Sequence, residues 1–215
     1  MIQDLKNIMC PQDKAFLQEL QRRAVSINAY DSIYADDQYY DGKKWTTRRI
    51  PLGGETRGTH IVMERTNPTN DATLIVHEGV HTGQPNSMPR RDKEYEAYTK
   101  EEEWRIAHNL PPGAANFRTV DSSGKVVPNV PAIRASVDND PTYAGISVPA
   151  PKKPGKPRPP PDEIVGVDAK GNTKLERADG TTYTRPPRKG DGFQGPTTTV
   201  PPTAIVIDIN KLQCP

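Results

Sequence analysis

The sequence predicts an α+β fold in which a compact front part is followed by a proline-rich, irregular or β-type C-terminal extension. Strand-like segments precede a capped apolar helix, and a second long helical segment follows it. Beyond Pro111, periodic apolar positions become sparse while Pro, Gly, Asn and Asp accumulate. We therefore expect a main domain over residues 1–112, a Pro-rich irregular linker over 113–162 and a small β-rich extension over 163–215.

The N-terminal part contains one helix-like and three strand-like segments. Residues 11–25 have the spacing of an amphipathic helix. Its apolar stripe consists of Phe16, Leu17, Leu20 and Ala24. Residues 27–40 and 43–50 are rich in residue types typical of strands, and Asp41-Gly42 between them is a hairpin turn signal. Residues 58–65 are a third strand candidate, directly before the next helix.

A short, buried helix is predicted to begin at residues 68–71 (Pro-Thr-Asn-Asp), which supply a breaker, capping side chains and an early acidic charge. The apolar run over 73–76 would bury the helix, and Gly83 followed by Pro85 would end it. Gly79 in its interior costs about 1 kcal/mol relative to alanine. Two explanations are open for this glycine: close approach of a substrate, or tight packing against a neighbouring helix.

The most informative feature of this helix is an H-E-x-x-H motif at residues 77–81. Residues i and i+4 of a helix lie on one face, so His77 and His81 can bind one Zn²⁺ from the same side. Glu78 lies about 100° around the helix from His77. It can therefore reach a zinc-bound water without being a ligand, which is the arrangement of a zinc-dependent peptidase.

A catalytic zinc site needs a third protein ligand and keeps one open position. Residues 91–106 are rich in good helix formers and end before Pro111, so they predict a second helix. Glu94 and Glu96 are both candidates, but they are about 200° apart on a helix and only one can face the metal. The helix face that contains Glu94 is the more apolar, so Glu94 is favoured over Glu96.

The segment 77–81 (HEGVH), followed by 94–97 (EYEA), resembles the gluzincin metallopeptidases. Their pattern is H-E-x-x-H and then, on the next helix, a glutamate ligand with a small residue three positions later. Carried over, the resemblance implies zinc ligands at His77, His81 and Glu94 and a general base at Glu78. It also implies a small zincin-like domain made of an active-site helix, a short β-sheet and a second, ligand-bearing helix. In zincins an edge strand before the first helix pairs with extended substrate, and residues 58–65 occupy that place.

Tyr98 is a departure from the gluzincin pattern, because many members have an acidic residue there that orients a ligand histidine. That role would fall to Glu101 or to a backbone carbonyl. Tyr98 is instead the favoured second catalytic residue, as a donor to the oxyanion that forms during peptide-bond hydrolysis. The other available donors on the second helix are Tyr95, Arg105 and His108.

Residues 58–108 also resemble, more loosely, metallopeptidase toxin domains of bacterial polymorphic toxins and type VI secretion effectors. This resemblance implies a protein or peptide substrate, delivery into a competitor or host cell, an immunity protein and a secretion-machine component as partners. Residues 1–5 lack a basic region followed by an apolar core, so we expect secretion or translocation without a cleavable signal peptide. The target compartment would be a periplasm or a cytoplasm.

Composition excludes two classes of function. The net charge of +2 is too balanced to indicate nucleic-acid binding, and no aromatic-basic recognition motif is visible. No apolar stretch approaches the roughly 18 residues of a membrane span. The basic proline-rich stretch at 149–161 is expected to be extended and solvated.

Two other functions remain open at this point. The same zinc site would serve an amidase acting on peptidoglycan, and a fortuitous H-E-x-x-H would leave a non-enzymatic secretion-apparatus or binding protein. The two cysteines, Cys10 and Cys214, either form a disulfide bond that links the two ends of nearly the whole chain or remain two unrelated thiols.

Overall fold

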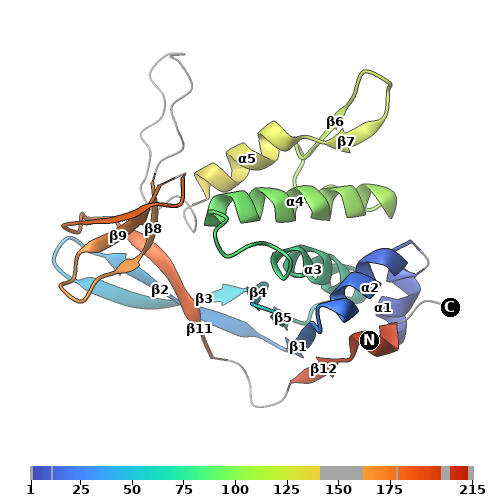
Figure 1. Cartoon of the computed structure of the whole chain (residues 1–215), viewed down its shortest axis with the longest axis horizontal. Coiled ribbons are helices and arrows are strands. Elements are labelled where there is room, and N and C mark those ends of the chain that lie inside the picture. The colour runs from blue at the N-terminus through green and yellow to red at the C-terminus, as the bar shows by residue number, and fades with distance from the viewer. Residues whose placement is uncertain (1, 11, 141–161, 178, 200–203, 213–215) are drawn as a thin grey trace.

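The computed structural model describes residues 2–10, 12–140, 162–177, 179–199 and 204–212, and its architecture is the predicted mixture of helices and sheets (Figure 1). Within these residues the helices are α1 (Ile2–Met9), α2 (Lys14–Arg22), α3 (Pro68–His81), α4 (Arg90–Ala107) and α5 (Val130–Asn139). The strands are β1 (Ser26–Tyr30), β2 (Ile33–Tyr40), β3 (Trp45–Leu52), β4 (Gly54–Arg57), β5 (His60–Glu64), β6 (Arg118–Val120), β7 (Val126–Pro128), β8 (Glu163–Val167), β9 (Thr173–Glu176), β10 (Thr182–Arg185), β11 (Gly192–Thr199) and β12 (Ile205–Ile207). A short 3-10 helix, η1 (Ile209–Leu212), follows β12.

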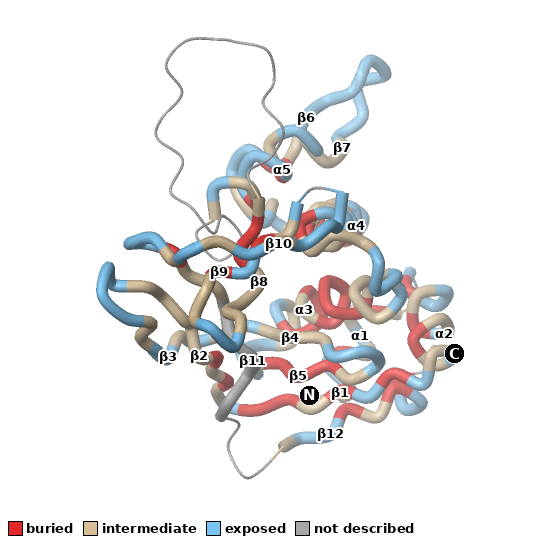
Figure 2. The backbone as a smooth tube through the Cα atoms, turned by 60° about the vertical axis from the view of Figure 1, so that its left-hand side comes forward, coloured by how far each residue is buried: buried red, intermediate tan, exposed pale blue. Residues whose placement is uncertain are grey.

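The sheet next to the site has the strand order β12-β1-β5-β4. Strands β1 and β5 are parallel, whereas β12 and β4 are antiparallel to their neighbours at the two edges. Helix α3 lies over β4 and β5, and α4 packs on the other side of α3 (Figure 1). The core lies between this sheet and helices α1, α2 and α3, where the buried residues are coloured red in Figure 2. Its fully buried side chains include Leu5, Leu20, Ile27, Ile61, Met63 and Ile75.

Helix α3 begins and ends close to the predicted positions, and local contacts explain both boundaries. The cap is Asn67, whose side chain accepts a hydrogen bond from the Asn70 N–H at 3.0 Å. Pro68 occupies the first turn, where its missing N–H leaves no hydrogen bond unmade. A Cβ on Gly79 would lie 2.7 Å from Cζ of Phe16, a residue of α2. Packing against a neighbouring helix, and not substrate access, therefore explains the glycine.

The predicted strand over 27–40 is wrong as a single element, because it is two strands in different sheets. The chain bends at Asp31 and Ser32, where the parallel pairing of β1 with β5 ends. Beyond the bend, β2 joins a second sheet of order β11-β2-β3. The predicted β2–β3 hairpin is confirmed, with the Asp41 carboxylate accepting hydrogen bonds from the Lys43 and Lys44 N–H groups at 2.7 and 2.9 Å.

The strand predicted over 58–65 forms as β5, but it does not lie at the edge of the sheet. It pairs with β1 on one side and with β4 on the other. The edge beside α3 is instead β4, a four-residue strand that was not predicted. The inner position of β5 in the sheet explains why this strand contributes three consecutive buried residues, Ile61, Val62 and Met63.

The chain is not divided in the expected way into a front domain, a linker over 113–162 and an extension over 163–215. Strand β12 pairs with β1, and β11 pairs with β2, so the C-terminal segment completes sheets that begin in the first 40 residues. Residues 118–139 form the β6–β7 hairpin and α5, which packs on α4 (Figure 1). The basic proline-rich stretch at 149–161 lies outside the described residues.

The packing of η1 brings the C-terminal part of the described chain against α1 and α2. Helix α1 was not predicted from the sequence, and Cys10 follows its last residue. Cys10 is disulfide-bonded, and its Sγ lies 3.8 Å from the carbonyl oxygen of Leu212. The other cysteine of the chain, Cys214, lies outside the described residues. None of the described helices combines the length and apolar character needed to cross a bilayer.

A buried carboxyl group at the start of β8 predicts a pH-dependent stability. Glu163 is 5 % exposed, and burial raises its pKa from the ordinary 4.5 to about 7 even though Arg90 and Arg91 act in the opposite direction. Because the folded protein disfavours the ionised form, Glu163 lowers stability progressively as the pH rises from about 4.5 to about 7. Glu163→Gln should therefore match the wild type below pH 4.5 and unfold at a higher temperature above pH 7.

Thermal unfolding in a pH series would measure this difference, with Glu103→Gln as a control on the exposed surface of α4. A difference in unfolding temperature between Glu163→Gln and the wild type that stays the same at every pH would contradict the prediction.

Candidate metal centre

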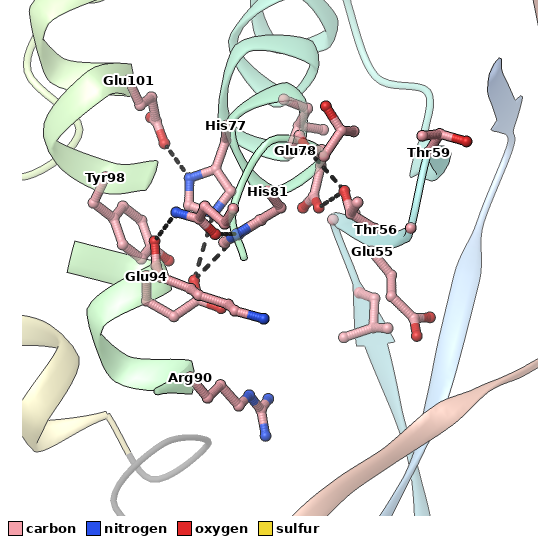
Figure 3. Close-up of a pocket in the computed structure, with 18 of the residues that line it drawn as sticks. Glu55, Thr56, Thr59, His77, Glu78, His81, Arg90, Glu94, Tyr98 and Glu101 are labelled. Carbon is pink, nitrogen blue, oxygen red and sulfur yellow. Dashed lines mark hydrogen bonds and ion pairs between the residues drawn. The ribbon is translucent and has the colours of Figure 1, made fainter. Parts of the chain in front are cut away.

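Helices α3 and α4 bring together the three residues that the sequence predicted as zinc ligands. His77 and His81 lie one turn apart on α3, and Glu94 faces them from the second turn of α4 (Figure 3). One ligand atom from each residue lies within 4.8 Å of the others. The Glu94 Oε2 atom is 3.5 Å from His77 Nε2 and 3.7 Å from His81 Nε2. These separations leave the three atoms surrounding a common point, as ligands of one cation would be.

The structure separates the two glutamates that the sequence left as alternatives. Glu94 is 9 % exposed and faces the two imidazoles. Glu96 is exposed, and its carboxylate accepts a hydrogen bond from Gln84 Nε2 at 3.0 Å. The helical offset between them explains this outcome, since two residues of separation turn a side chain to nearly the opposite face.

The Glu94 Oε2 atom is buried and has no hydrogen-bond partner. The two imidazole nitrogens nearest to it lie at ion-pair distances and are not placed to donate good hydrogen bonds. A buried carboxylate oxygen normally has a hydrogen-bond or metal partner, because leaving it unpaired is costly. The position and chemistry of this atom fit a divalent metal held by two nitrogens and one oxygen, the donor set of a catalytic zinc site.

The other nitrogen of each histidine is held by a side chain outside the cluster. His77 Nδ1 lies 3.0 Å from Glu101 Oε2, and His81 Nδ1 lies 2.8 Å from Gln84 Oε1. Because a carboxylate and an amide oxygen only accept hydrogen bonds, both Nδ1 atoms carry the proton and both Nε2 lone pairs remain available. Glu101 was one of the two predicted partners of a ligand histidine. Gln84 was missed, and its position three residues after His81 was the only local signal.

The electrostatics of the cluster favour a positive charge between its members. Burial disfavours protonation of His77, but the hydrogen bond to Glu101 and the nearby carboxylate of Glu94 outweigh it and raise the pKa of His77 to about 10. Burial also opposes ionisation of Glu94, yet His77 and His81 hold the pKa of this carboxyl below its usual range. The pocket therefore stabilises a cation next to an ionised carboxylate.

Glu78 lies on the side of α3 that faces strand β4, and it lines the same cavity as the three-residue cluster (Figure 3). It is 6 % exposed, and burial raises the pKa of its carboxyl group. The Thr56 hydroxyl lies 2.7 Å from Glu78 Oε2 and donates to it. A buried carboxylate with a raised pKa holds a proton more readily than an exposed one, as a group that accepts a proton during catalysis must.

Of the four predicted oxyanion donors, Tyr98 lines the cavity, and its ring lies 4.6 Å from that of His77 in an edge-to-face contact. The other three are not among the residues that line this cavity. Tyr95 donates to Asp138, Arg105 pairs with Glu101, and His108 contacts Asp13 and the Trp104 carbonyl. The structure thus leaves Tyr98 as the candidate among the four that borders the cavity of the cluster.

A cavity of about 790 Å³ opens between β4 on one side and α3 and α4 on the other. Its lining includes the three cluster residues, Glu78 and Tyr98, together with Gly53, Gly54, Glu55 and Thr56 from β4 and the residue before it. This volume lies in the range of ligand pockets and admits a short segment of polypeptide. The three-residue cluster is therefore accessible from a cavity whose opposite wall is an edge strand.

The hydrogen bond from His77 to Glu101 predicts a measurable effect on metal affinity. Glu101→Gln keeps the shape of the side chain but removes the charge that stabilises the Nδ1–H donor. We expect zinc affinity to fall by about 10- to 100-fold, as is typical for partners of ligand histidines. Competition with a chelating dye would measure it, and Glu103→Gln on the exposed face of α4 should leave affinity unchanged.

The chain matches no protein-family model, no curated protein and no solved structure. Inferences about function therefore depend on the geometry and chemistry of the site. The decisive features are the three-residue cluster, the unpartnered carboxylate oxygen of Glu94 and the buried Glu78 beside β4.

Proposed function

We propose that this protein is a zinc-dependent metallopeptidase that hydrolyses peptide bonds in protein or peptide substrates. The single observation that carries the proposal is the cluster of His77, His81 and Glu94 around an unpartnered, buried carboxylate oxygen. Two histidines and one glutamate are a donor set that catalytic zinc ions use. The resemblance of residues 77–81 and 94–97 to gluzincins supports the same assignment.

In the proposed reaction the chain contributes a base, an acid and an oxyanion donor. Bound zinc supplies Lewis acidity, which lowers the pKa of a water toward neutrality and polarises a carbonyl oxygen. Glu78 accepts a proton from the attacking water and delivers it to the nitrogen of the leaving amine. Tyr98 donates a hydrogen bond to the oxyanion that develops at the former carbonyl. Glu101 and Gln84 keep the two ligand imidazoles in the correct tautomer.

We further propose that the protein acts as a secreted or translocated bacterial toxin or effector, with an immunity protein and a secretion-machine component as partners. The support is the resemblance of residues 58–108 to metallopeptidase toxin domains. The disulfide at Cys10 adds to it, because such bonds persist in oxidising compartments such as a periplasm. Expression of the wild type in the cytoplasm or in the periplasm of a bacterium, with Glu78→Ala as control, tests this part of the proposal. If cells that express the wild type grow as well as cells that express Glu78→Ala in both cases, the toxin proposal is contradicted.

The test of the hydrolase proposal is removal and return of the metal. Purified protein should contain close to one zinc per chain, and dialysis against a chelator should abolish cleavage of a denatured protein mixture. Addition of zinc to the dialysed protein should restore cleavage. Release of products from purified cell wall, and not from protein, would instead indicate an amidase of peptidoglycan. A protein that takes up no zinc would indicate a non-enzymatic role.

A further inference from the structure

Strand β4 presents two different faces, and the face toward α3 carries only Gly54 and Thr56. Side chains alternate along a strand, so positions 54 and 56 share one face and positions 55 and 57 share the other. Glu55 and Arg57 pair with each other, with N···O separations of 2.9 and 3.2 Å. The charged pair therefore lies on the face opposite to the one that meets Glu78.

Thr56 makes two contacts with the same residue of α3. Its hydroxyl donates to Glu78 Oε2 at 2.7 Å and also lies 2.9 Å from the backbone carbonyl oxygen of Glu78 (Figure 3). The hydroxyl has one proton, which the two acceptors share. The contact with the backbone carbonyl ties β4 to this turn of α3. The contact with the carboxylate orients the side chain relative to its own backbone.

Gly54 is required on the same face for a steric reason. A Cβ at this position would lie 2.7 Å from Glu78 Oε1, shorter than real Cβ contacts, and 3.0 Å from its Cγ, which is tighter than most. The φ angle of Gly54 is not in the left-handed region, so the backbone itself does not demand glycine. Space for the Glu78 carboxylate is therefore the reason for a glycine here.

We propose that Gly54 and Thr56 form a positioning element for the general base Glu78, an inference that rests on the proposed hydrolytic function. Thr56 donates a hydrogen bond to Oε2 of Glu78, and the missing side chain of Gly54 leaves room around Oε1. Oε1 is then the oxygen that takes the proton as the water O–H bond breaks and the new C–O bond forms. The same proton leaves Oε1 for the amine nitrogen as the C–N bond breaks, so the carboxylate is regenerated. Thr56 remains a hydrogen-bond donor throughout and loses no proton.

This arrangement predicts an effect on turnover that is separate from metal binding. Neither residue belongs to the zinc cluster, so their replacement should leave zinc content unchanged. Loss of a positioning contact frees the base to adopt unproductive orientations, which lowers kcat much more than it raises KM. We expect Thr56→Val, which keeps the shape of threonine, to lower kcat by about 10- to 100-fold.

The experiment compares four variants of the full chain with zinc bound. Thr56→Ser restores a hydroxyl and should recover most of the kcat lost in Thr56→Val, whereas Gly54→Ala should lose kcat by displacing the carboxylate. Thr119→Val makes the same change on the exposed strand β6 and should behave as wild type. Zinc content, KM and kcat are measured for each. A Thr56→Val enzyme as active as wild type, or a Thr56→Ser enzyme no better than Thr56→Val, overturns the proposal.

A second measurement does not depend on catalysis. Unfolding temperatures of zinc-free wild type, Thr56→Val, Glu78→Ala and the double variant form a cycle that reports whether the two side chains interact, because each single change removes the hydrogen bond between them. The effects should be non-additive, and additivity overturns the contact on which the proposal depends. A wild type that binds zinc but cleaves no substrate overturns the hydrolytic function itself. An active wild type with an unaffected Thr56→Val overturns only the positioning role.

Discussion

Replacing Glu94 by alanine is expected to lower zinc affinity by more than about 100-fold, beyond the range typical for loss of a residue that only supports a ligand. Glu94 contributes the oxygen of the cluster, and this oxygen is buried with no hydrogen-bond partner of its own. Without it two imidazoles remain, which is fewer than the three protein ligands that catalytic zinc sites use. Metal analysis after dialysis should find close to one zinc per wild-type chain and little in the variant.

The matched control is Glu96→Ala, two residues further along the same helix. Glu96 is exposed and hydrogen-bonds to Gln84, so its removal should weaken zinc binding only slightly. Zinc should raise the unfolding temperature of the wild type and of Glu96→Ala, because a ligand that binds only the folded state stabilises it. Glu94→Ala should show no such rise. The reverse pattern, with zinc lost in Glu96→Ala and kept in Glu94→Ala, would refute the assigned ligand set.

The second large effect is expected for Glu78→Gln, which should lower kcat by about 10²- to 10⁴-fold while zinc content stays the same. Glutamine has the size of glutamate and can still accept a hydrogen bond from Thr56, so the local structure should survive. It cannot take up a proton as a carboxylate does. Glu78 is outside the three-residue cluster, which is why the metal should be retained.

Cleavage of a fluorogenic peptide by zinc-loaded enzyme would measure this loss, with Glu103→Gln as a control for a surface glutamate on α4. Equal kcat values for Glu78→Gln and wild type would be incompatible with a general base at this position. Loss of zinc from the variant would mean that Glu78 has a role in the metal site as well.

Much of the geometry of the candidate site was predictable because its determinants are local. The spacing of His77 and His81 gives two imidazoles on one helix face. Pro68 and Gly83 marked the approximate limits of α3, although its N-cap is Asn67 and not one of the capping residues expected within 68–71. Helix α4 was predicted to within one residue at each end, at Arg90 and Ala107. The choice of Glu94 over Glu96 followed from the more apolar character of its helix face, and the structure buries that face.

The partners of the site residues were less predictable, because each contact joins elements that are separate in the sequence. Thr56 is 22 residues from Glu78, and Glu101 is 24 residues from His77. The sequence left Glu101 as one of two options and gave no indication of Thr56. Strand β4 was missed since four residues that include a glycine carry little strand propensity.

The sequence by itself determined helices α3 and α4 and the three residues that face the candidate metal, because helical periodicity acts over a few residues. Only the tertiary structure decided which strand borders the cavity and that the C-terminal β12 completes the sheet beside β1. It also decided which side chains hold His77, His81 and Glu78 in place. Strand pairing and side-chain contacts across the fold depend on the packing of the whole chain, and no local pattern of residues encodes them.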